Sequence, residues 1–363
     1  MVFELLFLIV MLLLSAVTAV VVRRRRKPGQ PWLQVEPRPP ATWGLLDVTR
    51  TLLLFVLFQI VALQVLQSAT SINPAAGFEN MSSFQGGLVM GSDAIVKLTV
   101  VVVSLGIIAL RDRQLYRRLG LAGDTFVRDL KIGGVAFLIL AGPVYTIQGL
   151  LTQMFPSEHP LMTVFEREPS WWLFGVLSFV AVIAAPIAEE FMFRMLIQGW
   201  LEDLTRRLHG FQSLSPEPIE SEPVESQPVA AEQTASMPRG EQVFADDIPP
   251  VQADADEPNA DEPNAEDGSN PYVAPQATEQ DTEIVQAVEV AHTNVPRWPL
   301  FLSAALFAIL HASHGPDPIP LFVLAVGLGY VYRATHRLLP CVILHLLLNA
   351  SSMAMLWLSV GVN

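Results

Sequence analysis

The chain has 363 residues, of which 51% are hydrophobic and 16% are charged, and its mean hydropathy is positive. This composition is too apolar for an ordinary soluble protein, so we predict an integral membrane protein. The net charge of −13 indicates neither an acidic catalytic domain nor a nucleic-acid-binding surface, because residues 211–294 alone contribute −18 and leave +5 for the rest. A single cysteine, Cys341, excludes an intramolecular disulfide and a cysteine-cluster metal site.

Eight apolar segments follow one another along the chain, each long enough to cross or nearly cross the hydrocarbon core of a bilayer. They cover residues 2–22, 45–67, 94–110, 132–154, 171–200, 298–313, 319–333 and 338–360. The third, sixth and seventh segments are the short ones, so the number of spans depends on them. We predict an all-α, polytopic membrane helix bundle of about eight transmembrane helices.

Basic residues indicate how these segments are oriented. No basic residue precedes the first segment, whereas residues 23–27 read Arg-Arg-Arg-Arg-Lys, which is typical of a retained helix with a cytoplasmic C-terminal end. Alternation from there places the later basic clusters on the same side, namely Arg111, Arg113, Arg117, Arg118, Arg128, Lys131, Arg206, Arg207, Arg333 and Arg337. We expect a multi-pass protein of the plasma or inner membrane with both termini outside.

Residues 211–295 differ from the rest of the chain. They are rich in Pro, Glu, Ala and Gln, and they repeat Ala-Asp-Glu-Pro-Asn at 255–259 and 260–264. A sequence of this kind cannot bury a core, so we predict a disordered acidic insertion on the cytoplasmic side. We expect it to act as a tether or to bind a partner that the sequence does not identify.

The fifth segment contains charged side chains within otherwise lipid-soluble sequence. Its stretch AAPIAEEFMFRMLIQGW includes Glu189, Glu190 and Arg194, although an ionised side chain at the bilayer centre costs roughly 2.5–3.5 kcal/mol. Glu190 and Arg194 are four residues apart and share a helix face, so a purely structural ion pair is one interpretation, which leaves Glu189 unexplained. We expect Pro186 to kink the helix and to open space beside the carboxylates.

Two later segments supply polar residues of a complementary kind. The sixth contains His311, and the eighth contains His345 and Asn349, which are four residues apart on one helix face. At the rise of an α-helix, Glu190, His311 and His345 lie about 16, 20 and 10 Å from the inner ends of their segments. One inward-opening cavity can therefore hold all of them, although such a residue taken alone is more often an interhelical hydrogen-bond partner than a catalyst.

These residues occur in the order and spacing of a known family. Residues 189–194 (EEFMFR) resemble an EExxxR sequence, residues 307–311 (FAILH) an FxxxH sequence, and residues 345–349 (HLLLN) an HxxxN sequence. Together they resemble the three signatures of the CAAX protease and bacteriocin-processing family of intramembrane endopeptidases, which includes type II CAAX prenyl endopeptidase. The chain departs from the pattern at Met195, where many members have Gly, and in its long insertion.

The resemblance implies the following organisation. N-terminal transmembrane helices and a basic loop occupy 1–130, the two parts of the intramembrane protease core occupy 131–210 and 296–363, and the acidic insertion occupies 211–295. The expected function is hydrolysis of peptide bonds in membrane-associated, prenylated or leader peptides.

The resemblance also implies a catalytic role for Glu189 as the general base that deprotonates water, with His311 positioning that water or sharing its proton. A carboxylate in a low-dielectric cavity beside a second carboxylate holds protons more readily, which suits a base. His345 and Asn349 are donors suited to an oxyanion hole.

Glu190 and Arg194 are then expected to form the structural pair of the site. No cofactor is implied, but a zinc-dependent metalloprotease that uses the same residues, with His314 three residues after His311, is an alternative. A transporter or a non-catalytic membrane scaffold is a further alternative. The expected partners are a membrane-embedded or lipidated peptide and the lipid bilayer, without nucleic acid.

Overall fold

The structure of the protein is a computed structural model that describes residues 2–27, 29–36, 40–70, 72, 77, 80–155, 170–208, 296–312 and 317–360. All regular structure in these residues is helical, which confirms the predicted all-α class. The described residues all belong to one compact unit. The acidic insertion predicted at 211–295 lies outside the described residues.

The helices follow the predicted apolar segments closely. Their bounds are α1 (Val2–Arg25), α2 (Leu45–Thr70), α3 (Ser83–Ala109), α4 (Leu115–Arg118), α5 (Gly123–Met154), α7 (Trp171–Ser178), η3 (Phe179–Ala184), α8 (Ala185–Glu190), η4 (Phe191–Gln198), α9 (Gly199–Leu208), α11 (Trp298–Ile309), α12 (Pro318–Thr335) and α13 (Leu339–Val360). Within the described part of the chain, seven helical runs are long and apolar enough to cross a membrane. The sixth predicted segment corresponds to α11, which has only 12 residues, or about 18 Å at the usual rise, so α11 is too short to cross the hydrocarbon core and the predicted count of eight spans falls to seven among the described residues.

The segment that holds the charged residues is one helical run of 38 residues, 171–208. Two π-helical stretches, η3 and η4, interrupt its α-helical geometry on either side of α8. Pro186 lies in the first turn of α8, directly after η3. The proline that we expected to kink the helix is therefore preceded by a wider helical turn. Such π-helical turns occur frequently at functional sites.

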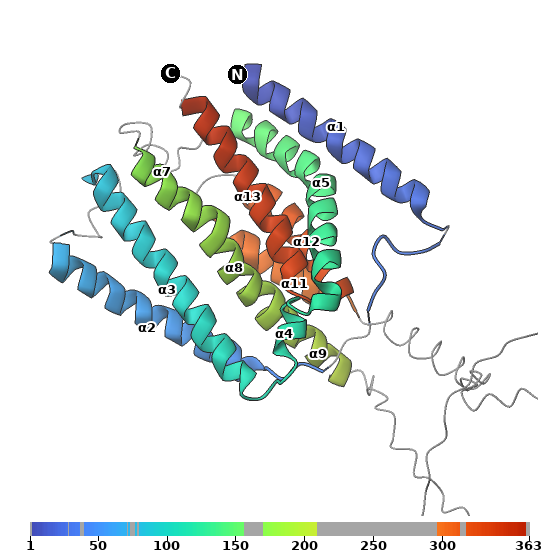
Figure 1. The fold of residues 1–363 in the computed structure, drawn as a ribbon, viewed down its shortest axis with the longest axis horizontal. Helices are drawn as coiled ribbons and strands as arrows, with labels where there is room; N and C mark the ends of the chain where they lie inside the picture. The colour runs from blue at the N-terminus through green and yellow to red at the C-terminus, as the bar shows by residue number, and fades with distance from the viewer. Residues whose placement is uncertain are drawn as a thin grey trace, which may run out of the picture. The chain divides into compact units, whose positions relative to one another are not determined.

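Helices α3, α11 and α13 contact this central run (Figure 1). α13 packs against α5 on one side and against η3 and α8 on the other, while α11 contacts η4 and α12. α1 packs on α5, and α2 packs on α3. The central run thus meets helices from both halves of the sequence, which brings its charged residues next to the later histidines.

The bundle has one end rich in basic residues, which we call the basic end. α1 ends there with Arg23, Arg24 and Arg25, α9 ends there with Arg206 and Arg207, and α5 begins there (Figure 1). The first residues of α1 and the last residues of α13 lie at the opposite end (Figure 1).

An ion cluster at the basic end holds the start of α13. The buried Arg337 guanidinium donates hydrogen bonds to both carboxylate oxygens of Asp129 and to Glu36. Burial alone would lower the pKa of Arg337, but its hydrogen bonds to Glu36 and Asp129 and their negative charges raise it above the ordinary value. We call Glu36, Asp129 and Arg337 the Glu36 network. His336, the residue directly before Arg337, has a left-handed backbone (φ 52°) and caps the C-terminal end of α12.

Candidate active site

Glu190 and Arg194 form a fully buried ion pair on one face of the central helix. Arg194 Nε lies 3.0 Å from Glu190 Oε2, and both side chains have 0% exposure. The other oxygen of Glu190, Oε1, lies 2.9 Å from His345 Nδ1 on α13. Arg194 also donates through Nη1 to the Ser303 hydroxyl on α11. The carboxylate of Glu190 therefore has a partner on each oxygen, and this pair links three helices.

Glu189 has a different environment, although it is the adjacent residue. Its Oε1 lies 4.0 Å from His311 Nε2, and its Oε2 lies 3.9 Å from His345 Nε2. Both separations are too long for direct hydrogen bonds. Glu189 is 20% exposed and His311 is 33% exposed, whereas His345 is buried. The carboxylate of Glu189 thus faces two imidazole nitrogens across gaps on the accessible side of the site.

The second nitrogen of each imidazole fixes its orientation. His311 Nδ1 lies 2.7 Å from the carbonyl oxygen of Phe307, and a carbonyl only accepts, so this nitrogen carries a proton. His345 Nδ1 faces the carboxylate of Glu190 in the same way. When the rings are neutral, Nε2 of each is therefore an unprotonated acceptor directed at Glu189.

Phe307 packs at the centre of the site. Its ring centroid lies 5.2 Å from that of Phe193, 4.7 Å from that of His311 and 5.9 Å from that of His345. The guanidinium carbon of Arg194 lies 5.3 Å from the same ring. Since Phe307 is fully buried, it holds both histidines and the arginine in fixed positions and excludes water from that side.

Asn349 binds the backbone of the π-helical stretch. Its Nδ2 donates to the carbonyl oxygen of Ala181 at 2.8 Å. The N–H of Ala185, which would bond this carbonyl in an α-helix, bonds Val180 instead, and Pro186, the partner in a π-helix, has no N–H. The carbonyl of Ala181 therefore lacks a helical donor, and Asn349 supplies one from α13.

Two further side chains satisfy carbonyls of η4, and the sequence analysis did not identify them. The Ser303 hydroxyl donates to Phe193 O at 2.7 Å, and Trp43 Nε1 donates to Met195 O at 2.9 Å. Ser303 lies eight residues before His311 in the same apolar segment, and Trp43 precedes α2 by two residues, so neither has a local sequence signal. Both contacts join distant segments to the helix that carries the charged residues.

The structure thus brings together Glu189, Glu190, Arg194, His311 and His345, and it places Asn349 one helical turn from His345 on α13. Across the described residues, no group of three or more His, Cys, Asp and Glu side chains has an arrangement that could hold a metal ion. His314, which the zinc alternative includes, lies outside the described residues.

Comparison with known proteins places this site in a family context. Residues 284–351 match the family model described as Type II CAAX prenyl endopeptidase Rce1-like. This range contains the FxxxH and HxxxN sequences, while EExxxR precedes it. No curated protein and no solved structure matches the chain. The family match supports a membrane-protease activity of the CAAX type, and the apolar helices indicate a multi-pass integral membrane protein. The predicted resemblance to the CAAX protease and bacteriocin-processing family is thereby confirmed.

Proposed function

We propose that the protein is an intramembrane endopeptidase in which Glu189 activates the attacking water. One observation supports this proposal above the others: Glu189 is accessible and faces His311 and His345 across 4.0 and 3.9 Å, whereas Glu190 is buried and has a partner on each oxygen. A water that contacts two polar atoms at about 2.8 Å each fits a gap of this width.

The proposed water lies between Glu189 and the Nε2 atoms of the two histidines. Glu189 and the neutral ring of His311 both accept hydrogen bonds, so a donor is required between them. A water supplies two hydrogens, one for the carboxylate and one for an imidazole nitrogen. Its oxygen then keeps its lone pairs free to attack a carbonyl carbon.

In the proposed reaction, the water oxygen bonds to the carbonyl carbon of the scissile amide while Glu189 accepts one of its protons. The carbonyl π electrons move to the oxygen, which becomes an oxyanion. When this intermediate collapses, the carbon–nitrogen bond breaks, and the amine takes the proton from Glu189. The products are a carboxyl group and an amine, and the carboxylate of Glu189 is regenerated.

His345 and Asn349 are the proposed donors to the oxyanion. Because Nδ1–H of His345 is directed at Glu190, the ring donates through Nε2 only as the charged imidazolium, so in this proposal His345 enters the reaction already protonated and keeps that proton throughout. The amide of Asn349 has two N–H groups, of which one is used by Ala181, so the second remains for the oxyanion. Glu190 and Arg194 are proposed to have a structural role, since they orient His345 and join the helices.

The proposed substrates are membrane-embedded or lipidated peptides, because the site lies within the apolar run of the central helix. No cofactor is part of this proposal. A zinc-dependent reaction that uses the same residues is the alternative, since histidine and glutamate are the usual ligands of a catalytic zinc, although the described side chains are not arranged to hold the ion.

The test is cleavage of a prenylated, fluorescently labelled peptide by the purified full-length protein in lipid vesicles. Glu189→Gln should lower the cleavage rate about 10²–10⁴-fold, whereas Asp93→Asn, which neutralises a carboxylate of α3 paired with Lys97, should not lower it. The wild-type protein should retain its rate after treatment with a chelator. Complete loss with the chelator and recovery with zinc would overturn the water mechanism in favour of the zinc candidate, and a Glu189→Gln variant that cleaves at the wild-type rate would overturn both.

A further inference from the structure

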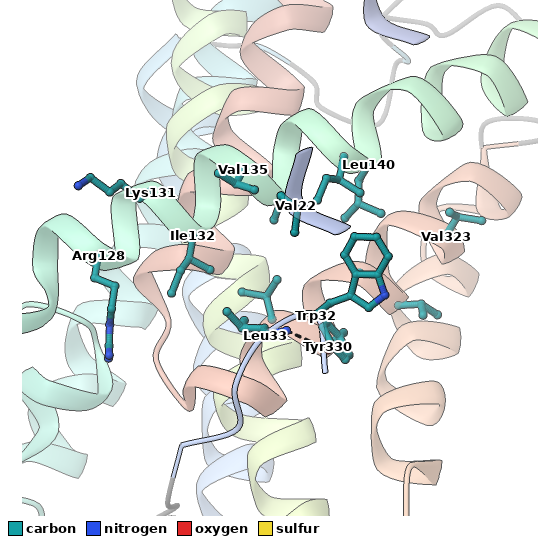
Figure 2. A pocket seen from close by; sticks show the side chains of 15 residues that line it. Val22, Trp32, Leu33, Arg128, Lys131, Ile132, Val135, Leu140, Val323 and Tyr330 are labelled. Atoms are coloured by element: carbon teal, nitrogen blue, oxygen red, sulfur yellow. Dashed lines mark hydrogen bonds between the residues drawn. The ribbon is translucent and has the colours of Figure 1, made fainter. Parts of the chain in front are cut away.

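A second cavity lies apart from the candidate active site, between α1, α5 and α12 and beside the segment that follows α1 (Figure 2). Its volume is about 620 Å³, which falls within the ~300–1,000 Å³ typical of ligand pockets. None of the described residues that line it belongs to the site around Glu189. The mechanism proposed above does not use this cavity.

The cavity is elongated along the helices. On α5 its lining extends from Arg128 to Leu140, and on α12 it extends from Val323 to Val331. Leu140 lies nine positions after Lys131 on α5, which corresponds to about 14 Å along the helix axis. A slot of this direction and length matches a hydrocarbon chain that lies parallel to the transmembrane helices.

The polarity of the lining changes along the slot. Most of the side chains that line the cavity are aliphatic, while Arg128 and Lys131 lie at one edge of it (Figure 2). Two aromatic residues, Trp32 and Tyr330, also line it, and the Tyr330 hydroxyl accepts a hydrogen bond from the N–H of Leu33. Trp and Tyr are enriched where hydrocarbon meets the polar headgroup layer, so these two side chains suit a position at the boundary of a bilayer leaflet.

Two cations beside the cavity lack acidic partners among the described residues. The guanidinium carbon of Arg26 lies 5.1 Å from the Trp32 ring, and its buried Nε has no hydrogen-bond partner. Lys131 is exposed and forms no ion pair with a described residue, whereas Arg128 is paired with Glu36 at 2.7 Å. An unpartnered guanidinium N–H beside an apolar slot indicates an anionic ligand that carries a hydrocarbon chain.

We propose that this cavity binds one anionic phospholipid, with an acyl chain in the slot between α5 and α12 and its phosphate at Arg26 and Lys131. A zwitterionic headgroup complements these charges less well, because its ammonium group is repelled by them, whereas basic pockets between transmembrane helices suit anionic headgroups. The bound lipid fills the space between α1, α5 and α12 and joins the segment around Trp32 to them. This inference does not depend on the proteolytic mechanism.

The test measures binding of phosphatidylglycerol and phosphatidylcholine to the purified full-length protein in detergent, by native mass spectrometry and by the thermal unfolding midpoint. Phosphatidylglycerol should bind more tightly and raise the midpoint more. Arg26→Gln and Lys131→Gln should each weaken its binding about fivefold. Arg113→Gln, which removes an exposed charge outside the cavity lining, should leave binding unchanged.

Val135→Trp, which places a large ring in the slot, should reduce binding of both lipids without changing the charge. Equal binding of the two lipids by the wild-type protein would overturn the proposal. So would unchanged binding in the Arg26, Lys131 and Val135 variants. Displacement of phosphatidylglycerol by a prenylated peptide at equal concentration would overturn it in favour of a site for the lipid chain of a substrate.

Discussion

Among the described residues, the Glu36 network and the candidate active site each bring two carboxylates close to an arginine, and they differ in how completely these carboxylates are bonded. In the Glu36 network, Arg337 reaches both oxygens of Asp129 and also Glu36, which in turn accepts from Arg128. In the candidate active site, Glu190 is bonded as fully, by Arg194 and His345. Glu189 alone faces its nearest polar neighbours across gaps of about a water's width.

In our proposal this difference separates a structural ion cluster from a reactive one. A carboxylate with a donor on each oxygen is held in place, and its counter-ion and hydrogen bonds favour the charged form, so it takes a proton less readily. A carboxylate that is accessible and faces acceptors across a gap retains a free position from which to take a proton from a substrate or water. We therefore propose separate roles for the adjacent residues Glu189 and Glu190, although both have the same side chain.

The largest expected effect comes from breaking the buried pair of the site. Arg194→Leu leaves the charge of Glu190 without its counter-ion in a fully buried position, and such losses cost about 3–5 kcal/mol. We expect a correspondingly lower free energy of unfolding, measured by chemical denaturation in detergent. The double variant Arg194→Leu with Glu190→Gln should recover part of that loss, because no unpaired charge remains. A single variant as stable as the wild type would contradict the structural role of the pair.

Asn349 tests whether the site needs a donor from α13 beyond the histidine. Removal of one oxyanion donor typically lowers kcat by about 10²–10³, so we expect a loss of this size in Asn349→Ala. The same change also leaves the carbonyl of Ala181 without its donor, so a small loss of stability should accompany it. The comparison of kcat with the unfolding midpoint separates the two effects. A stability loss with an unchanged kcat would restrict Asn349 to binding the helix backbone.

The smallest effect is expected in the Glu36 network. Glu36→Gln removes one charge at a partly exposed position, while Asp129 remains bonded to Arg337, so we expect a loss of about 1–2 kcal/mol in the free energy of unfolding. The rate of peptide cleavage per folded molecule should not change. A large loss of kcat in a stable Glu36→Gln protein would show that the two clusters are coupled through α13.

The sequence predicted the helices and the residues that converge, because both depend on local patterns. Apolar runs define the spans, and a spacing of four residues places Glu190 with Arg194 and His345 with Asn349 on single helix faces. The two π-helical stretches were not predicted, since they depend on donors from distant segments. Trp43 and Ser303 satisfy carbonyls of η4 from 152 and 110 residues away. No local pattern encodes such pairs. The sequence therefore predicted only a kink at Pro186, where the structure has two π-helical stretches.

The most direct test of the account compares Glu189→Gln with Glu190→Gln in one assay of peptide cleavage and thermal unfolding. The account predicts that Glu189→Gln unfolds at the wild-type midpoint but cleaves about 10²–10⁴-fold more slowly, the usual contribution of a general base. Glu190→Gln should unfold at a lower midpoint. If Glu189→Gln instead cleaves at the wild-type rate and a folded Glu190→Gln protein is inactive, then the buried carboxylate is the base and the account is wrong.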